Sequence, residues 1–314
     1  MCSLVSSPRY VLVTAAHNEE AFIQKTILSV ISQMLPPKKW VIVNDGSTDN
    51  TAQIVQRYAR EYSFIQLLEL AETHPPDFGA QVHAIKAGCE ALRSGNTKFD
   101  YIGNLDSDIS FEPSYFSELL GKFEADPTLG LAGGWLYEGD KDEFKPRKGN
   151  RSTCVPHAVQ LFRRACFQAV GGYMQLRYGA PDRCAEVSAR MNGWRVQSFP
   201  KLKVFHHRRT GNVSGGLQYS YRAGLSAFSL GSHPLFEVAK CVSRLHHRPY
   251  LLGSVARLAG FAVGYYRGEG RQVSPQFVRF LRHEQKGKLR SAFLAPLKLV
   301  QPPVSSAGFQ HPTN

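Results

Sequence analysis

Several patterns that mark particular classes of protein are absent from this 314-residue sequence. Its six cysteines lie far apart and form no C-x-x-C pair, which argues against a disulfide scaffold or a zinc site and favours reduced thiols. The first residues lack the basic-then-apolar pattern of a signal peptide. The most apolar stretch, residues 251–266, carries Arg257 and is shorter than the roughly 20 residues that span a bilayer. These absences predict a cytoplasmic globular protein.

Acidic residues are scarce in the last third of the chain. From Gly215 onward there are thirteen Lys and Arg but three acids, so an excess of ten positive charges lies there, out of a net charge of +13. Such a segment predicts an anionic partner: a membrane surface, a nucleic acid or an anionic substrate. No recognisable module of interleaved stacking aromatics accompanies the charge, so we expect no nucleic acid.

The basic segment beyond Gly215 is expected to be helical, because no strong strand pattern occurs in it. Its charge is accompanied by large apolar residues: Leu251, Leu252, Leu258, Phe261 and Tyr265. Two interpretations stay open. The helices either lie in the interface of an anionic membrane or pack against the rest of the protein. The sequence from Gln301 onward is rich in Pro and Ser and is predicted to be disordered.

The opening of the chain predicts a strand, a helix and a second strand. Residues 11–14 and 40–43 are short runs rich in β-branched residues, and apolar residues recur at helical spacing between them. This order is typical of a parallel sheet in an α/β fold. The first turn has no G-x-G-x-x-G, which argues against a dinucleotide-binding site.

Carboxylates follow two of the predicted strands, where open α/β sheets bind ligands. Asp45 comes after strand 40–43 and leads into a helix for which Thr48 or Asp49 is the expected N-cap. Asp106 and Asp108 come after strand 101–105. Two such neighbouring acids suit a divalent cation bound to phosphate oxygens. An ordinary polar turn is the alternative at both places.

The middle of the chain predicts more strands and three further helices. We expect strands at 64–70, 130–135, 158–163, 194–199 and 201–205. Helices are expected after residues 78–80, over residues 113–124 and from Pro181-Asp182 onward, and the charged stretch 138–151 is expected to be an exposed loop.

Several of these segments together resemble family 2 of the glycosyltransferases, which have the GT-A fold. Residues 14–20, T-A-A-H-N-E-E, are similar to the family's T-P-A-Y-N-E-E, and residues 43–51, V-N-D-G-S-T-D-N-T, to its V-D-D-G-S-T-D-x-T. Asp106-Ser107-Asp108 stands in the place of the D-x-D motif. Residues 171–173, Asp182 and residues 193–196 follow the order of the family's G-G-F, E-D and G-Y-R-I. The resemblance covers about residues 8–211.

The resemblance also implies roles for individual residues. Asp182 would be the catalytic base, with Glu186 next in line. Asp106, Asp108 and His206 would bind Mg²⁺ or Mn²⁺, with His207 as the alternative to His206. The nucleotide-sugar would be held by these residues: Thr14, His17, Glu19, Asp45, Lys86 and Asp106.

Four positions depart from the family pattern. His17 replaces a Tyr but is still flat enough to stack on a base, and Asn44 replaces the first acid of a D-D pair. Lys86 stands where many relatives have Asn, which would add a cation near the donor phosphates. Pro181 replaces the Glu before the base, which fixes φ and removes an amide donor but leaves the carboxylate of Asp182 in place.

By this resemblance the protein is an inverting, metal-dependent glycosyltransferase. It would move a sugar from a nucleotide-diphospho-sugar to a saccharide or lipid-linked acceptor, in the synthesis of extracellular polysaccharide or cell-envelope glycan. A catalytically inactive nucleotide-sugar-binding or membrane-docking protein of the same fold is the alternative. A sugar nucleotidylyltransferase would need a Gly-rich first loop with a following Arg or Lys, and residues 14–20 offer none.

Three segments are expected along the chain. Residues 1–212 would form the GT-A domain, residues 213–300 a basic helical extension and residues 301–314 a disordered tail. We expect a cytoplasmic location, with the inner face of the cell membrane as the candidate surface for the basic helices.

Overall fold

The computed structural model describes residues 8–70, 78–140, 143–208, 216–244 and 250–298. The disorder expected for residues 301–314 concerns a segment outside this described part of the chain. Within it, the strands are β1 (Tyr10–Ala16), β2 (Lys39–Asn44), β3 (Ile65–Glu69), β4 (Tyr101–Leu105), β5 (Ile109–Phe111), β6 (Leu129–Asp140), β7 (Glu143–Pro146), β8 (Val159–Arg163) and β9 (Arg195–His206). The helices of the first two thirds are α1 (Ile23–Ile31), α2 (Thr51–Glu61), α3 (Phe78–Ser94), α4 (Tyr115–Ala125), α5 (Arg164–Val170) and α6 (Pro181–Met191). The last third contributes α7 (Gly216–Ser229), α8 (Pro234–Val242), α9 (Tyr250–Tyr266) and α10 (Pro275–Lys298).

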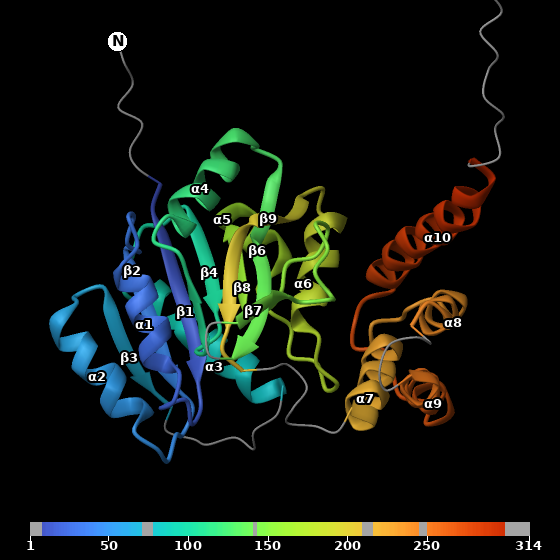
Figure 1. Ribbon diagram of the computed structural model, residues 1–314, viewed down its shortest axis with the longest axis horizontal. Coiled ribbons are helices and arrows are strands. Elements are labelled where there is room, and N and C mark those ends of the chain that lie inside the picture. The colour runs from blue at the N-terminus through green and yellow to red at the C-terminus, as the bar shows by residue number, and fades with distance from the viewer. Residues whose placement is uncertain (1–7, 71–77, 141–142, 209–215, 245–249, 299–314) are drawn as a thin grey trace, which may run out of the picture.

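The strands form one sheet with helices on both faces, which confirms the predicted α/β architecture (Figure 1). The order is β3-β2-β1-β4-β8-β6-β9-β5, with β7 paired to β6. Strands β3, β2, β1 and β4 are mutually parallel, as expected for the opening of the chain. Beyond β4 the sheet is mixed, because β8 runs antiparallel to both β4 and β6 while β9 is parallel to β6.

The central strands are buried on both faces, which is why they are apolar without interruption. Successive side chains of β1 point to opposite faces of the sheet. Tyr10 and Leu12 enter the core under α1, α2 and α4, whereas Val11 and Val13 enter the core under α3, α5 and α6. The sheet thus separates two apolar cores, and its polar residues collect where the strands end.

Three expectations about local structure were wrong. The charged stretch 138–151 is not simply a loop, because β6 continues to Asp140 and pairs with β7 as an antiparallel hairpin. The two short strands expected at 194–199 and 201–205 are one strand, β9, whose register against β6 shifts between Gly134 and Trp135. The N-cap of α2 is Asn50.

Helices α7, α8 and α9 pack on one another, whereas α10 packs on α6 of the sheet-containing part as well as on α8. The backbones of α7 and α9 meet at glycines. A Cβ at Gly224 would lie 2.0 Å from the carbonyl oxygen of Arg257, and one at Gly260 would lie 2.1 Å from that of Tyr221. Figure 1 places α9 on the side of α7 that faces away from the sheet. Among the described helices, none has both the length and the hydropathy of a membrane span.

Substitution of Gly260 tests this backbone contact. Gly260→Ala should lower the free energy of unfolding by about 1–3 kcal/mol, because the new methyl group meets backbone that cannot rotate away. Gly121→Ala in α4 is the matched control, since a Cβ there meets nothing within 4 Å and should stabilise the helix by about 0.5–1 kcal/mol. Urea denaturation measures both. Equal stabilisation by the two substitutions would show that α7 and α9 do not approach this closely.

Candidate active site

Two loops at the carboxyl ends of β1 and β2 hold each other in place. Asn18, at a φ of 53°, accepts a hydrogen bond from the backbone N–H of Thr48 at 2.8 Å, and its own N–H donates to Ser47 Oγ at 3.0 Å. The N–H of Glu19 donates to Thr51 Oγ1 at 2.8 Å. The small hydroxyl and amide side chains of these loops are therefore fixed partners for the opposing backbone, which explains why the two motifs occur together.

Asp49, one of the two expected N-cap residues, also helps to hold these two loops together. Its carboxylate accepts hydrogen bonds from the N–H groups of Glu20 at 3.1 Å and Thr51 at 3.0 Å. Glu20 in turn accepts from the N–H of Asn50 at 3.0 Å. The Asp49 side chain thus lies at the start of α2 without being its N-cap.

A cavity of about 770 Å³ opens where β1, β2 and β4 end, which is where the sequence predicted a ligand site. A volume of this order suits a small organic ligand. The strand ends supply one side of the cavity through His17, Glu19, Asp45 and the loop 106–108. The opposite side comes from much later in the chain: Arg177, Tyr178, Gln218, Tyr221 and Arg222.

Asp45 lines this cavity with a carboxylate that is only partly paired. The residue is 8% exposed, and its Oδ1 is buried with no hydrogen-bond partner among the described residues. Leaving such a group buried and unpaired costs about 1–3 kcal/mol. Beside it, His17 Nδ1 donates to the Asp45 carbonyl oxygen at 2.6 Å, so the imidazole ring is held at the cavity edge.

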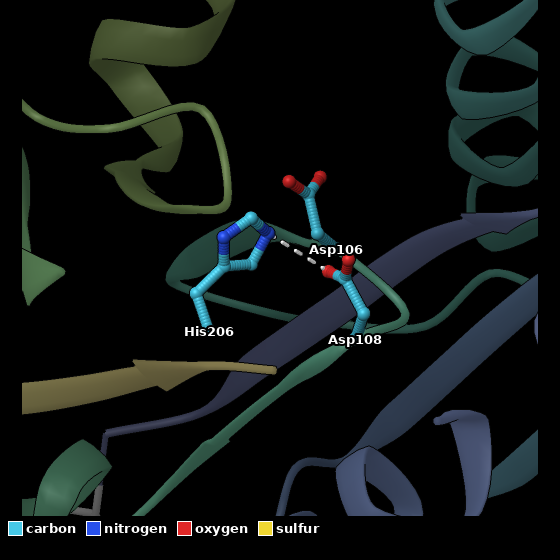
Figure 2. Close-up of side chains that lie close together, drawn as sticks. All are labelled: Asp106, Asp108 and His206. Atoms are coloured by element: carbon cyan, nitrogen blue, oxygen red, sulfur yellow. Dashed lines mark ion pairs between the residues drawn. The ribbon is translucent and has the colours of Figure 1, made fainter. Parts of the chain in front are cut away.

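Two carboxylates and one imidazole converge at the end of β4. One ligand atom from each of Asp106, Asp108 and His206 lies within 4.8 Å of the others (Figure 2). His206 Nε2 is 3.2 Å from Asp108 Oδ1, and Nδ1 of the same ring is buried with no partner in the described part of the chain. Carboxylate and imidazole donors together suit Mn²⁺, and the two carboxylates suit Mg²⁺ with water as further ligands. The donor set therefore fits the expected divalent cation.

The alternation of β9 separates the two candidate histidines. His206, at the end of the strand, faces Asp108, whereas His207 Nε2 lies 2.9 Å from Ser110 Oγ and its ring packs edge-on against Phe144. His206 is consequently the one of the pair that is placed to complete a metal site with Asp106 and Asp108.

Arg208, which the sequence did not single out, lies among these acids. Its guanidinium is 2.6 Å from Glu19 Oε2 and 3.7 Å from Asp108 Oδ2. Burial raises the pKa of Glu19 to about 7, the charge of Asp108 adds to this shift, and Arg208 opposes it. Arg208 is thus the internal counter-ion of the acidic side of the cavity.

His157 lies beside the proposed metal group. Its Nδ1 is 3.4 Å from Asp106 Oδ1, and its Nε2 is buried with no hydrogen-bond partner among the described residues. Burial alone would lower the pKa of this imidazole, but the hydrogen bond and charge of Asp106 and the charge of Asp182 raise it overall. Asp182 itself does not line the cavity.

Pro181 fits the start of the helix that carries Asp182. It occupies the first turn of α6, where a missing N–H costs little, after Ala180 in the left-handed conformation at a φ of 67°. Glu186, one turn later, is 5% exposed and accepts a hydrogen bond from the N–H of Val155 at 2.6 Å. Its carboxylate therefore ties α6 to the segment before β8.

Two of the residues expected at the nucleotide lie elsewhere. Thr14 is fully buried, and its Oγ1 accepts a hydrogen bond from the indole of Trp40 at 3.0 Å. Lys86 lines a separate cavity of about 700 Å³, next to Glu90 and Arg93. From the same helix, Gln81 lines the first cavity instead, and its amide lies 3.3 Å from Asp106. A helical period of 3.6 residues explains how a position five residues further on turns away.

A sequence model of the family described as "Glycosyl transferase family 2" matches residues 11–179 of the chain. Poly-beta-1,6-N-acetyl-D-glucosamine synthase of Staphylococcus epidermidis is 29% identical over 143 residues, which are 45% of this chain and 29% of that protein. The synthase of the same name from Staphylococcus aureus strain COL is 28% identical over 141 residues, again 45% of this chain and 29% of its own length. The chain thus spans less than a third of these relatives.

Solved structures share the fold over most of the chain. The mannosyltransferase PcManGT from Pyrobaculum calidifontis, in complex with GDP-Man and Mn²⁺, has a TM-score of 0.55 and 18% identity, over 95% of this chain and 89% of that one. TarS 1-349 of S. aureus, in complex with UDP-GlcNAc, has a TM-score of 0.53 and 15% identity, over 92% and 88% of the two chains. At such identities the likeness establishes the fold, and it confirms the GT-A architecture that the sequence motifs predicted.

The buried carboxyl group of Glu186 makes stability depend on pH. Burial raises its pKa to about 8, and the charge of Asp182 adds to the shift. The folded state therefore holds this proton more tightly than the unfolded chain, so stability should fall as the pH rises from about 4.5 to about 8. Glu186→Gln should flatten this dependence and melt higher than the unmodified protein at pH 8, but not at pH 4.5. Glu124→Gln, at an exposed position on α4, controls for the lost charge; an identical response of the two variants would contradict the assignment.

Proposed function

Because this chain belongs to glycosyltransferase family 2, we propose that it transfers a sugar from a nucleotide-diphospho-sugar to an acceptor hydroxyl, with inversion at the anomeric carbon. The observation that carries the proposal is the convergence of Asp106, Asp108 and His206 beside a cavity that is also lined by Asp45. The product would belong to an extracellular polysaccharide or a cell-envelope glycan, as the names of the Staphylococcus synthases suggest.

The strand-end side of the cavity would bind the nucleotide. The Asp45 carboxylate would accept a hydrogen bond from the base or ribose, and the His17 ring would stack on the base. Gln81 and Glu19 border the same space. The complexes of PcManGT with GDP-Man and of TarS with UDP-GlcNAc support a nucleotide-sugar as donor.

The acids at the end of β4 would hold the metal. Asp106, Asp108 and His206 are its proposed ligands, and the bound ion would neutralise charge on the leaving diphosphate. Arg208 is paired with Glu19 and Asp108 in this structure, so it also supplies positive charge to the same place. The Mn²⁺ in the PcManGT complex supports a divalent ion as cofactor.

Asp182 would act as general base. The acceptor oxygen attacks the anomeric carbon as the bond from that carbon to the diphosphate oxygen breaks, and Asp182 takes the acceptor proton. His157, whose Nδ1 is 3.4 Å from Asp106 Oδ1, would fix the position of that carboxylate. We place the reaction in the cytoplasm, with a saccharide acceptor that is free or carried on a lipid.

The metal group can be tested without knowing the sugar. In a thermal-shift panel of nucleotide-sugars, the true donor at 100 times its dissociation constant should add about 2.7 kcal/mol of stability, and this gain should need Mn²⁺ or Mg²⁺. Asp108→Asn should abolish the metal-dependent part and the release of nucleoside diphosphate, whereas the exposed Glu124→Gln should change neither. Full turnover by Asp108→Asn, or in excess chelator, would refute the metal site.

The base is tested by a substitution that keeps shape. Asp182→Asn should lower turnover by roughly 10²–10⁴-fold, because the proton acceptor is lost, and should leave donor affinity nearly unchanged. Kinetics at saturating donor and calorimetric binding of the donor separate the two effects. If Asp182→Asn loses donor binding but keeps its rate at saturating donor, another carboxylate is the base. If the unmodified protein turns over none of the donors, an inactive binding protein is favoured.

A further inference from the structure

Helices α8 and α9 expose apolar side chains where a helix on a protein surface normally exposes polar ones. Six large residues, which we call the outer face, are between 46% and 65% exposed: Leu235, Val238 and Val242 on α8, and Leu251, Leu252 and Val255 on α9. Further along α9, Ala259 and Ala262 are also exposed. No charged side chain is exposed on either helix within its described positions.

The charges of these two helices point inward. Glu237 of α8 is fully buried and Arg257 of α9 is 8% exposed; Arg257 Nε and Nη2 donate to Glu237 Oε2 at 2.9 and 2.8 Å. Two buried ions are costly to remove from water, and their pairing compensates this cost without favouring the fold strongly. The two helices therefore bury this ion pair and expose apolar side chains, which is the reverse of an ordinary surface helix.

Some apolar residues of α9 that the sequence suggested for an interface belong to the core. Phe261 is buried, and its ring packs against Phe228 of α7 with centroids 6.4 Å apart. Leu258 is half-buried. Leu251 and Leu252 remain on the outer face, so packing on α7 accounts for one side of α9 but not for the other.

The last third of the chain carries no free negative charge among its three acids. Glu237 is paired with Arg257, Glu269 accepts from Tyr178 Oη at 2.5 Å, and Glu284 accepts from Arg190 Nε at 2.6 Å. Two exposed cations follow these helices in the chain. Arg244 comes just after α8, and Arg267 comes just after α9, where its Nη1 is 3.9 Å from Glu269 Oε1. The outer face thus belongs to a segment with a large excess of positive charge.

We propose that the outer face inserts into the interfacial layer of an anionic membrane, with α8 and α9 lying along the surface. The apolar residues would enter the boundary between headgroups and acyl chains while Arg244 and Arg267 meet lipid phosphates. None of the described helices is suited to span a bilayer, which agrees with a surface position. This interaction does not depend on the proposed reaction.

Charge favours a membrane over a second copy of the chain as the occupant. In a symmetric dimer through the outer face, two segments that each carry an excess of ten positive charges would approach each other, because a two-fold contact pairs a surface with itself. A membrane rich in anionic lipid supplies the opposite charge instead. Figure 1 shows α8 and α9 on the far side of α7 from the sheet, so a membrane bound to the outer face would not contact the sheet.

Vesicle binding of the full chain tests the proposal. The protein should sediment with vesicles of phosphatidylcholine that contain about one third phosphatidylglycerol, bind pure phosphatidylcholine more weakly, and be released at high salt. Leu252→Glu/Val255→Glu should lower the partition coefficient at least about tenfold, because it places charge in the apolar layer. The matched control is Leu28→Glu/Met34→Glu, which removes two exposed apolar residues of the catalytic part and should bind like the unmodified protein.

A second pair of substitutions and one probe complete the experiment. Arg244→Gln/Arg267→Gln should lower binding to the anionic vesicles roughly fivefold per residue and leave binding to neutral ones unchanged. In Leu252→Trp, the fluorescence of the new indole should shift to the blue when vesicles are added, and brominated lipid should quench it. Light scattering supplies the mass of each variant.

Three outcomes would each overturn the proposal. They are equal vesicle binding by the two Glu variants, no vesicle binding by the unmodified protein, and a dimer that Leu252→Glu/Val255→Glu converts to monomer. Release of nucleoside diphosphate from the donor, measured without vesicles, reports separately on the reaction.

Discussion

Repulsion between carboxylates governs the arrangement of this site. The carboxyl ends of parallel β1, β2 and β4 bring Glu19, Asp45, Asp106 and Asp108 to one edge of the sheet, where like charges in partly dry surroundings destabilise one another. Each neighbour of the group offsets this. Histidines lie next to Asp106 and Asp108, and Arg208 forms an ion pair with Glu19. The raised pKa of Glu19 also favours its protonated, uncharged form. The same excess of negative charge is what prepares the edge for a cation.

The sheet and its acidic edge could be predicted from the sequence because their signals are local. Short, mostly apolar runs followed by a carboxylate mark both the strand and the place where it stops, as at Asp45 and Asp106. The opposite wall of the cavity could not be predicted in this way. Tyr178 and Tyr221 come from segments that no pattern links to β1, and their approach follows from the packing of α7.

Smaller misjudgements arose where one pattern suits two structures. Charged residues between 138 and 151 are typical of a loop, yet an exposed β-hairpin at the end of a long strand has the same composition. His206 was the expected metal ligand with His207 as the alternative, and the structure distinguishes the two because their side chains face different partners, Asp108 and Ser110. Lys86 followed from a resemblance at one position, and the helical period turned it to another cavity.

The backbone contact between α7 and α9 has a mechanical consequence. Where glycines let two helices touch without side chains between them, there is nothing soft to absorb a shift, because packed protein is hardly compressible. One of these helices forms a wall of the cavity and the other lies behind it, so the two transmit displacement as a single solid body. A displacement of α9 would therefore be passed to Tyr221 and Arg222, residues of α7 that line the cavity.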